Sequence, residues 1–190
     1  MSKFISVSFL IIVSFSLCYG QKQSEKSEWK DFASEELKFK ATFPGIPNAT
    51  VDGLDAKLGK TYARWFIVTL PHRFFGVSVS DFPNLPLMLR EDQLKTNYDN
   101  LRDGVIKQTG LKLVSERDIR LGEQYGREIT LTNDKEILTN RLYLVRQRLF
   151  QSITTMQTSQ AKDEGAQKDT LKFLDSFQFV ESKGQSSAKN

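Results

Sequence analysis

"NRLYLVRQRLFQSITT" (residues 140–155) decides the fold, because it can be either a charged binding surface or two strands of a β-hairpin. Neighbouring residues of a strand point to opposite sides, so Leu142 and Leu144 share one side and Tyr143 lies on the other. A second apolar run returns after a two-residue connection at Arg146 and Gln147. The pattern therefore predicts a hairpin with apolar residues on both of its faces.

The connection itself is unusual for a tight hairpin. Arg and Gln are poor residues for the positive φ angles of a primed turn, so a longer or strained turn is expected. Arg146 and Arg148 would then lie at the tip, where charged side chains are ordinarily solvated. Together with Arg141, these two arginines form a candidate surface patch if the tip binds a partner.

The segments before this hairpin predict more strands. "LKFKATFP" (37–44) alternates apolar and polar residues until a proline ends it. "TYARWFIVTL" (61–70) and "FFGVSVSDF" (74–82) instead place two aromatic residues side by side. Adjacent residues face opposite ways, so both faces of this part of the sheet should be covered, with "PHR" as the turn between the two strands.

The period changes to that of a helix between residues 88 and 108. Leu94, Tyr98, Leu101 and Val105 recur at helical spacing, and Gly110 follows as a stop signal. Further strands are expected in 111–121, 125–133 and, as a pair, inside 136–157, followed by a helix at about 166–176 and a short strand at "FQFV".

The first twenty residues resemble a secretory leader. Lys3 is their only charge, and the apolar run that follows is shorter than a membrane-spanning helix requires. Cleavage is expected between Gly20 and Gln21, which makes the protein periplasmic or extracellular. The alternative is a lipoprotein anchored at Cys18, which Leu17 disfavours because a small residue normally stands at that position.

Composition divides the rest of the chain. Residues 21–36 are polar and are expected to form a tether, with Trp29 and Phe32 docking as a short helix. One domain should span 37–180, and 181–190 should be a disordered tail. The net charge of +4 falls by one when the leader is removed. The remaining positive charge is too small and too dispersed for a nucleic-acid binder.

With its elements in this order, the chain resembles the PsbP-like family. The matching segments are "FKATFPGIP", "FFGVSVSDFP", "GREITL", "NRLYLVRQRLFQ" and "LKFLDSF", which fall within 37–180. The resemblance implies an α+β fold in which an antiparallel sheet is covered by helices on both faces. Members of this broad fold include an extrinsic photosystem subunit, a binder of a nuclear transport GTPase and exported bacterial proteins of unknown role. The family pattern suggests a small-residue turn where this chain has Arg146 and Gln147.

Catalytic chemistry has few candidates. His72 is the only histidine and Cys18 the only cysteine, which leaves no histidine pair, triad or thiolate metal site in the exported chain. Asp99 and Asp103 share one side of the long helix and could act as an acid–base pair, but arginine and lysine alternate with them as on a solvated surface. No glycine-rich phosphate loop occurs, and no cofactor or metal is expected. "NAT" (48–50) is an N-glycosylation acceptor if the host is eukaryotic.

Three functions follow from these observations. The favoured one is an exported, non-catalytic domain that binds a protein or envelope component, without nucleic acid and without a membrane span. The alternative is binding of a small apolar ligand between the sheet and the long helix, lined by Trp65, Phe66, Phe75 and Tyr98. Core packing explains the same aromatic residues. A hydrolase that uses Asp99 and Asp103 is the third.

Overall fold

The protein is described here by a computed structural model that covers residues 28–56 and 59–180. Its strands are β1 (Lys30–Ser34), β2 (Phe39–Phe43), β3 (Asn48–Ala56), β4 (Gly59–Leu70), β5 (Arg73–Asp81), β6 (Lys112–Leu121), β7 (Gln124–Thr132), β8 (Glu136–Val145), β9 (Arg148–Gln157) and β10 (Gln178–Phe179). Its helices are α1 (Glu91–Thr109), α2 (Glu164–Ser176) and the single 3-10 turn η1 (Thr158–Gln160).

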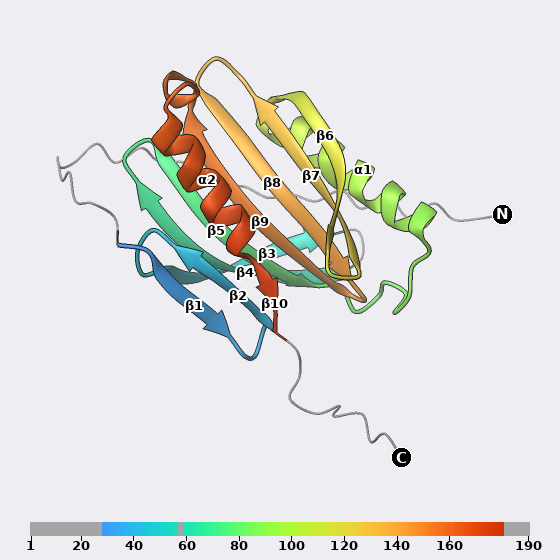
Figure 1. The fold of residues 1–190 in the computed structure, drawn as a ribbon. Coiled ribbons are helices and arrows are strands. Elements are labelled where there is room, and N and C mark those ends of the chain that lie inside the picture. Colours follow the sequence, from blue (N-terminus) through green and yellow to red (C-terminus); the bar gives the residue numbers. More distant parts are fainter. Residues whose placement is uncertain (1–27, 57–58, 181–190) are drawn as a thin grey trace.

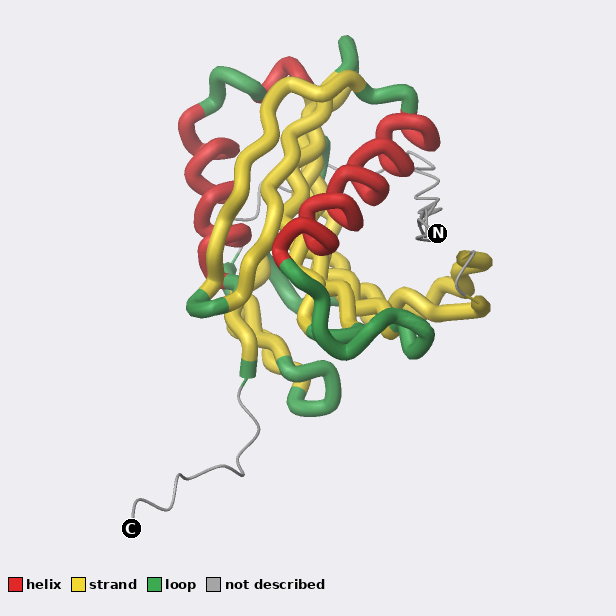
Figure 2. Tube along the Cα trace, turned by 90° about the vertical axis from the view of Figure 1, so that its right-hand side faces the viewer, coloured by secondary structure: helices red, strands yellow, loops and turns green. Residues whose placement is uncertain are grey.

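Seven strands form one antiparallel sheet in the order β3-β4-β5-β9-β8-β7-β6. A smaller sheet has the order β1-β2-β10. Helix α1 lies across one face of the large sheet, and α2 with the small sheet covers the other (Figures 1 and 2). The predicted α+β class, with an antiparallel sheet covered on both faces, is confirmed.

The large sheet separates two cores, as its paired aromatic residues predicted. Trp65 and Phe74 belong to the core beneath α1, and their neighbours Phe66 and Phe75 face the core beneath α2. The second core is mostly aromatic: the ring of Phe173 lies 5.1 Å from that of Phe43 and 5.5 Å from that of Phe75. Edge-to-face contacts of this kind add to the stabilisation gained from burial alone.

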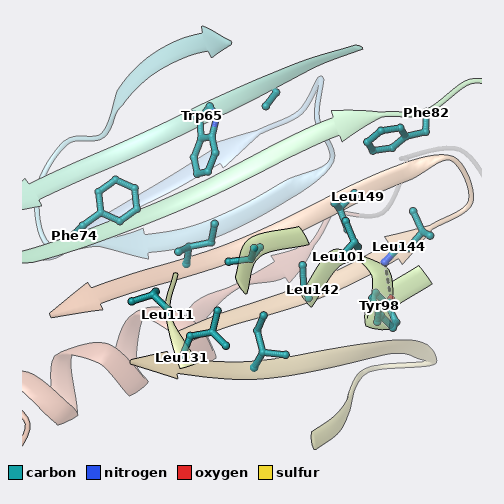
Figure 3. Packing of buried hydrophobic residues seen from close by; sticks show 14 of the residues in the cluster. Trp65, Phe74, Phe82, Tyr98, Leu101, Leu111, Leu131, Leu142, Leu144 and Leu149 are labelled. Carbon is teal, nitrogen blue, oxygen red and sulfur yellow. Dashed lines mark hydrogen bonds between the residues drawn. The ribbon is translucent and has the colours of Figure 1, made fainter. Parts of the chain in front are cut away.

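Helix α1 begins and ends close to its predicted limits. Gly110 adopts the left-handed conformation at its C-terminus and donates to the carbonyl of Ile106, which only a residue tolerant of positive φ does readily. The predicted apolar positions Tyr98, Leu101 and Val105 are buried. Figure 3 shows Tyr98 and Leu101 against leucines of β8.

Tyr98 also joins α1 to the sheet by hydrogen bonds. Its hydroxyl accepts from the amide of Leu144 at 2.8 Å and donates to the carbonyl of Tyr125 at 3.0 Å. Burial raises the pKa of Tyr98, so the hydroxyl keeps its proton across the physiological range.

Replacing Tyr98 by phenylalanine should lower the free energy of unfolding by about 1–3 kcal/mol, because two buried backbone groups lose their partner. Denaturant unfolding measures the change. Tyr62→Phe is the control, since Tyr62 is 61% exposed and should be neutral. Equal stability of the two variants would contradict a bonding role for the Tyr98 hydroxyl.

The hairpin predicted from residues 140–155 is confirmed. Strands β8 and β9 pair in register up to Val145 and Arg148, which leaves Arg146 and Gln147 as a two-residue turn. Arg146 has φ +57°, a conformation that costs a side-chain-bearing residue free energy. The turn is therefore short and strained rather than longer.

Two segments differ from the prediction. Residues 30–34, expected within a tether that docks as a short helix, form β1, because Phe32 packs 4.8 Å from the ring of Phe66 while the residues on either side of it remain exposed. The glycine-containing segment after Pro47 was not recognised as a strand and forms β3. Both are edge strands, so much of their surface is polar or exposed and the apolar pattern is weak.

Candidate functional site

The β8–β9 turn holds the loop of residues 82–90, which joins β5 to α1. The side-chain amide of Gln147 donates to the carbonyls of Pro83 (2.7 Å) and Leu85 (2.6 Å). The backbone carbonyl of Gln147 accepts from the amide of Phe82 at 2.6 Å. These three bonds give the unusual turn residue a function, because a small residue at this position could not make the two side-chain bonds.

A row of ion pairs continues from the turn across β9 and β5 to the middle of β4. Arg148 on β9 and Arg64 on β4 bind the two carboxylate oxygens of Asp81 on β5, at 2.6 and 2.7 Å. Arg64 also binds Glu36 at 2.6 Å. Each arginine side chain is less than a third exposed, so water screens these pairs only in part. The row fixes the end of β5 and the start of β9 relative to the middle of β4.

A hollow of about 420 Å³ opens beside this row and is called here the end hollow. Strand β4 pairs with β5 only from Ala63 onward, whereas its pairing with β3 continues to Gly59, so the β3–β4 hairpin projects beyond the sheet (Figure 2). The end hollow lies at the base of this projection. It is lined by Val51, Thr61, Tyr62, Arg64, Asp81 and Pro83.

Four exposed apolar side chains lie in the end hollow or on the loop beside it. Val51 and Tyr62 line the end hollow, and Leu87 and Met88 lie on the 82–90 loop, which begins beside it at Pro83. The other large exposed apolar residues of the described chain lie elsewhere: Ile46, Leu113, Val114 and Leu171. Met88 is 89% exposed. Neighbouring exposed apolar side chains beside a hollow are typical of an interaction surface.

The three arginines of the candidate patch have different surroundings. Arg146 is exposed at the turn, whereas Arg148 binds Asp81. Arg141 lies further along β8 with its side chain only 12% exposed, between Glu128 and Asp175 at 2.6 and 2.7 Å. Only Arg146 is therefore a freely exposed charge, and sequence alone had placed both Arg146 and Arg148 in solvent.

The four aromatic residues of the candidate ligand site are divided by the sheet. Trp65 and Tyr98 lie in the core beneath α1, while Phe66 and Phe75 lie in the core beneath α2. None of the four lines the end hollow or a second hollow of about 320 Å³ beside the small sheet. The structure thus brings them together only in pairs, within the two cores.

His72 and the helix carboxylates occupy structural positions. His72 has φ +66° in the β4–β5 turn, and its carbonyl accepts from the amide of Gln157 at 3.0 Å. Asp99 and Asp103 both bind Arg102, at 3.2 and 2.9 Å. Within residues 28–56 and 59–180, no group of three or more histidine, cysteine, aspartate or glutamate side chains is placed to hold a metal ion.

A larger charge network, which sequence reasoning did not identify, connects α1 to β6 and β7. Arg127 on β7 is 7% exposed. It binds Asp99 of α1 at 3.1 Å and Asp118 of β6 at 2.8 Å, and it also binds Glu116 of β6. Because Arg127 binds one carboxylate on α1 and two on β6, it helps to fix the position of α1 on the sheet.

Glu128 occupies a similar place on the opposite face, between Arg117 and Arg141 at 2.7 and 2.6 Å. Burial alone would raise the pKa of Glu128, but the hydrogen bonds from the two arginines outweigh it and hold this pKa below its ordinary value. The folded state therefore favours ionised Glu128, and its contribution to stability is present above the pKa of the unfolded chain.

That contribution should disappear as the pH falls through the lowered pKa of the folded state. Glu128→Gln should therefore lower the melting temperature at pH 7, and the difference from wild type should shrink below about pH 4.5, where the unfolded glutamate is protonated. Thermal unfolding between pH 7 and pH 3 tests this. Glu123→Gln, at an exposed position, should follow wild type throughout. A difference that grows on acidification would refute the argument.

The remaining predicted sites divide into those inside and those outside the described residues. Asn48 is exposed as the first residue of β3, where its glycosylation stays a prediction. Cys18, the Gly20–Gln21 cleavage position and the 181–190 tail lie outside the described residues. Neither α1 nor α2 is long and apolar enough to span a bilayer, and no other helix in the described chain qualifies.

Comparison with known proteins gives similarity at the level of structure. No protein-family model matches the sequence, and a search of curated proteins found no match. The solution structure of cyanobacterial PsbP (CyanoP) from Synechocystis sp. PCC 6803 matches with a TM-score of 0.53 and 12% identity, over 85% of this chain and 99% of that one. A crystal structure of a Pseudomonas aeruginosa protein of unknown function has a TM-score of 0.42 and 12% identity, over 76% of this chain and 94% of that one. The match to CyanoP shows that the chain has a PsbP-like fold.

Proposed function

We propose that this chain is an exported, non-catalytic domain that binds a protein partner through the end hollow and the 82–90 loop. The observation that carries the proposal is the placement of Leu87 and Met88, whose apolar side chains project from a loop that Gln147 holds in place. A fixed loop loses little conformational entropy on binding, so its apolar contacts translate efficiently into affinity.

The surroundings of the loop suit a protein better than a small molecule. The end hollow is open on the surface, and its Arg64–Asp81 pair offers polar groups beside the apolar Val51 and Tyr62. An apolar centre with polar groups around it is the usual composition of a protein–protein interface. Small-molecule sites, in contrast, enclose most of their ligand.

The experiment is affinity capture with the immobilised chain from the envelope and secreted fractions of the native host. The test variant carries Leu87→Ser and Met88→Ser. The control carries Leu171→Ser on α2, which removes another exposed leucine, 53% exposed against 62% for Leu87. Wild type and control should retain the same protein, whereas the test variant should bind it at least about tenfold more weakly.

Two outcomes would overturn the proposed function. One is equal retention by all three proteins, which would move the interface away from the loop. The other is an absence of any specifically retained protein together with substrate turnover by the purified chain. If a double variant with Asp99→Ala and Asp103→Ala then remained folded but lost this turnover, the hydrolase hypothesis would replace the binding hypothesis.

Export makes a separate prediction. We expect the native protein to begin at Gln21, so that its intact mass corresponds to residues 21–190 and its migration on gels is unchanged by reducing agents. It should partition into the aqueous phase with detergent. A mass that starts at an acylated Cys18 would contradict cleavage after Gly20 and would place the protein on a membrane surface.

A further inference from the structure

The two edges of the seven-stranded sheet differ in how they are protected. At β6, the register shifts between Leu113 and Ser115, and charged residues follow at Glu116, Arg117 and Asp118. A bulge and a run of charges are the devices by which proteins prevent an edge from pairing with another strand. The β6 edge is therefore protected.

Strand β3, the other edge, lacks this protection. Its nine residues pair with β4 without a register shift. Residues 48–53 are all exposed, and Asp52 is the only charge among them. In the described part of the chain, no strand pairs with the outer side of β3. Every second residue of such an edge directs its backbone N–H and C=O outward, and these groups specify an extended strand as the partner.

We infer that the outer edge of β3 pairs with β3 of a second copy of this chain, antiparallel and centred on Val51. A two-fold axis at this position places Val51 opposite its own copy, Thr50 opposite Asp52 and Ala49 opposite Gly53. No like charges meet between residues 48 and 54. A centre at Asp52 would instead oppose two carboxylates, which is destabilising in directly facing pairs.

The position of Tyr62 favours the same register. Tyr62 pairs with Gly53 across β3 and β4, and a carbon of its ring lies 3.8 Å from where a Cβ on Gly53 would stand. Gly53 of one copy would face Ala49 of the other, whose methyl group leaves room for the ring. The exposed Tyr62 and Val51 would thus both become covered on pairing.

Pairing would also complete the end hollow. Val51 and Tyr62 line it, so the second copy would add a wall along the β3 side. This consequence rests on the proposed function, but the pairing itself does not. Val51 lines the end hollow, so the tests are separated by what they measure: self-association of the purified chain reports on β3, whereas capture of a partner by the Leu87 and Met88 variant reports on the proposed function.

Cysteine cross-linking identifies the register. A chain that begins at Gln21 lacks Cys18, so Val51→Cys or Asp52→Cys introduces its only thiol. Residues directly opposite one another lie within disulfide reach, whereas the two copies of residue 52 would lie one position to either side of the axis, two positions apart along the strands, and beyond that reach. With oxidised glutathione, Val51→Cys should give a covalent dimer at least about tenfold faster than Asp52→Cys.

Sedimentation equilibrium over a wide range of concentrations measures the uncrosslinked assembly. The chain from Gln21 onward should reach the mass of a dimer, and Val51→Lys should shift the midpoint of association at least about tenfold toward higher concentration. At concentrations where both proteins are monomers, their melting temperatures should be equal. Leu113→Lys, the control on the β6 edge, should behave as wild type. A monomer at all concentrations, a dimer unaffected by Val51→Lys, or equal cross-linking at residues 51 and 52 would overturn the inference.

Discussion

Phe173→Ala should lower the free energy of unfolding by about 3–5 kcal/mol, the range for removing a buried aromatic side chain. Phe173 is fully buried, and its ring touches those of Phe43 and Phe75, so the substitution leaves a cavity between α2, β2 and β5. Because the neighbouring rings are themselves packed on both sides, they have little freedom to collapse into the space.

Leu171→Ala is the matched control, since Leu171 is on the same helix but 53% exposed. Its stability should remain close to that of wild type. Guanidinium unfolding followed by circular dichroism measures both variants. A loss below about 1 kcal/mol for Phe173→Ala would mean that the aromatic core can rearrange, contrary to the close packing of its rings.

Arg127→Gln should lower the free energy of unfolding by about 3 kcal/mol. The substitution leaves Glu116 and Asp118 beside one another without their shared cation, and it also removes a partner from Asp99. Breaking a buried pair costs about 3–5 kcal/mol, and the low end applies because Asp99 and Asp118 are about half exposed.

Arg90→Gln provides the comparison for Arg127→Gln, because the Arg90–Asp92 pair is largely exposed and should contribute little. The Arg127 variant should also be rescued in part by a second substitution, Glu116→Gln, which removes a carboxylate that would keep only Arg102 as its partner. Double-mutant analysis of the four proteins tests this coupling. Additive losses would show that Arg127 and Glu116 do not act together.

The sequence predicted the parts of the fold that depend on local pattern. The helical spacing of Tyr98, Leu101 and Val105 located α1, and the adjacent aromatic residues of β4 and β5 correctly indicated two cores. Strands β1 and β3 were missed, because edge strands bury too little to show the alternation that defines a strand. The other two edge strands, β6 and β10, were predicted, so a place at the edge weakens the pattern without always hiding it.

The candidate site was harder to predict, since its contacts join residues far apart in the chain. Arg148 is 67 residues from Asp81, and Gln147 is 64 residues from Pro83. Nothing in the local sequence distinguishes Arg148, which is paired, from Arg146, which is exposed. Such pairs become visible only when the strand order is known, because β5 and β9 are neighbours in space although α1 and three strands separate them in sequence.

The attachment of the 82–90 loop to the hairpin turn has a consequence for motion. If Gln147 releases Pro83 and Leu85, the loop loses two of its fixed points and the strained Arg146 can relax at the same moment. The turn and the loop should therefore open together, as one unit of low local stability. Their amide hydrogens should exchange with solvent at a common rate, faster than those of the β8–β9 ladder. A partner that binds Leu87 and Met88 should therefore also slow hydrogen exchange in the β8–β9 turn, even without contacting the turn.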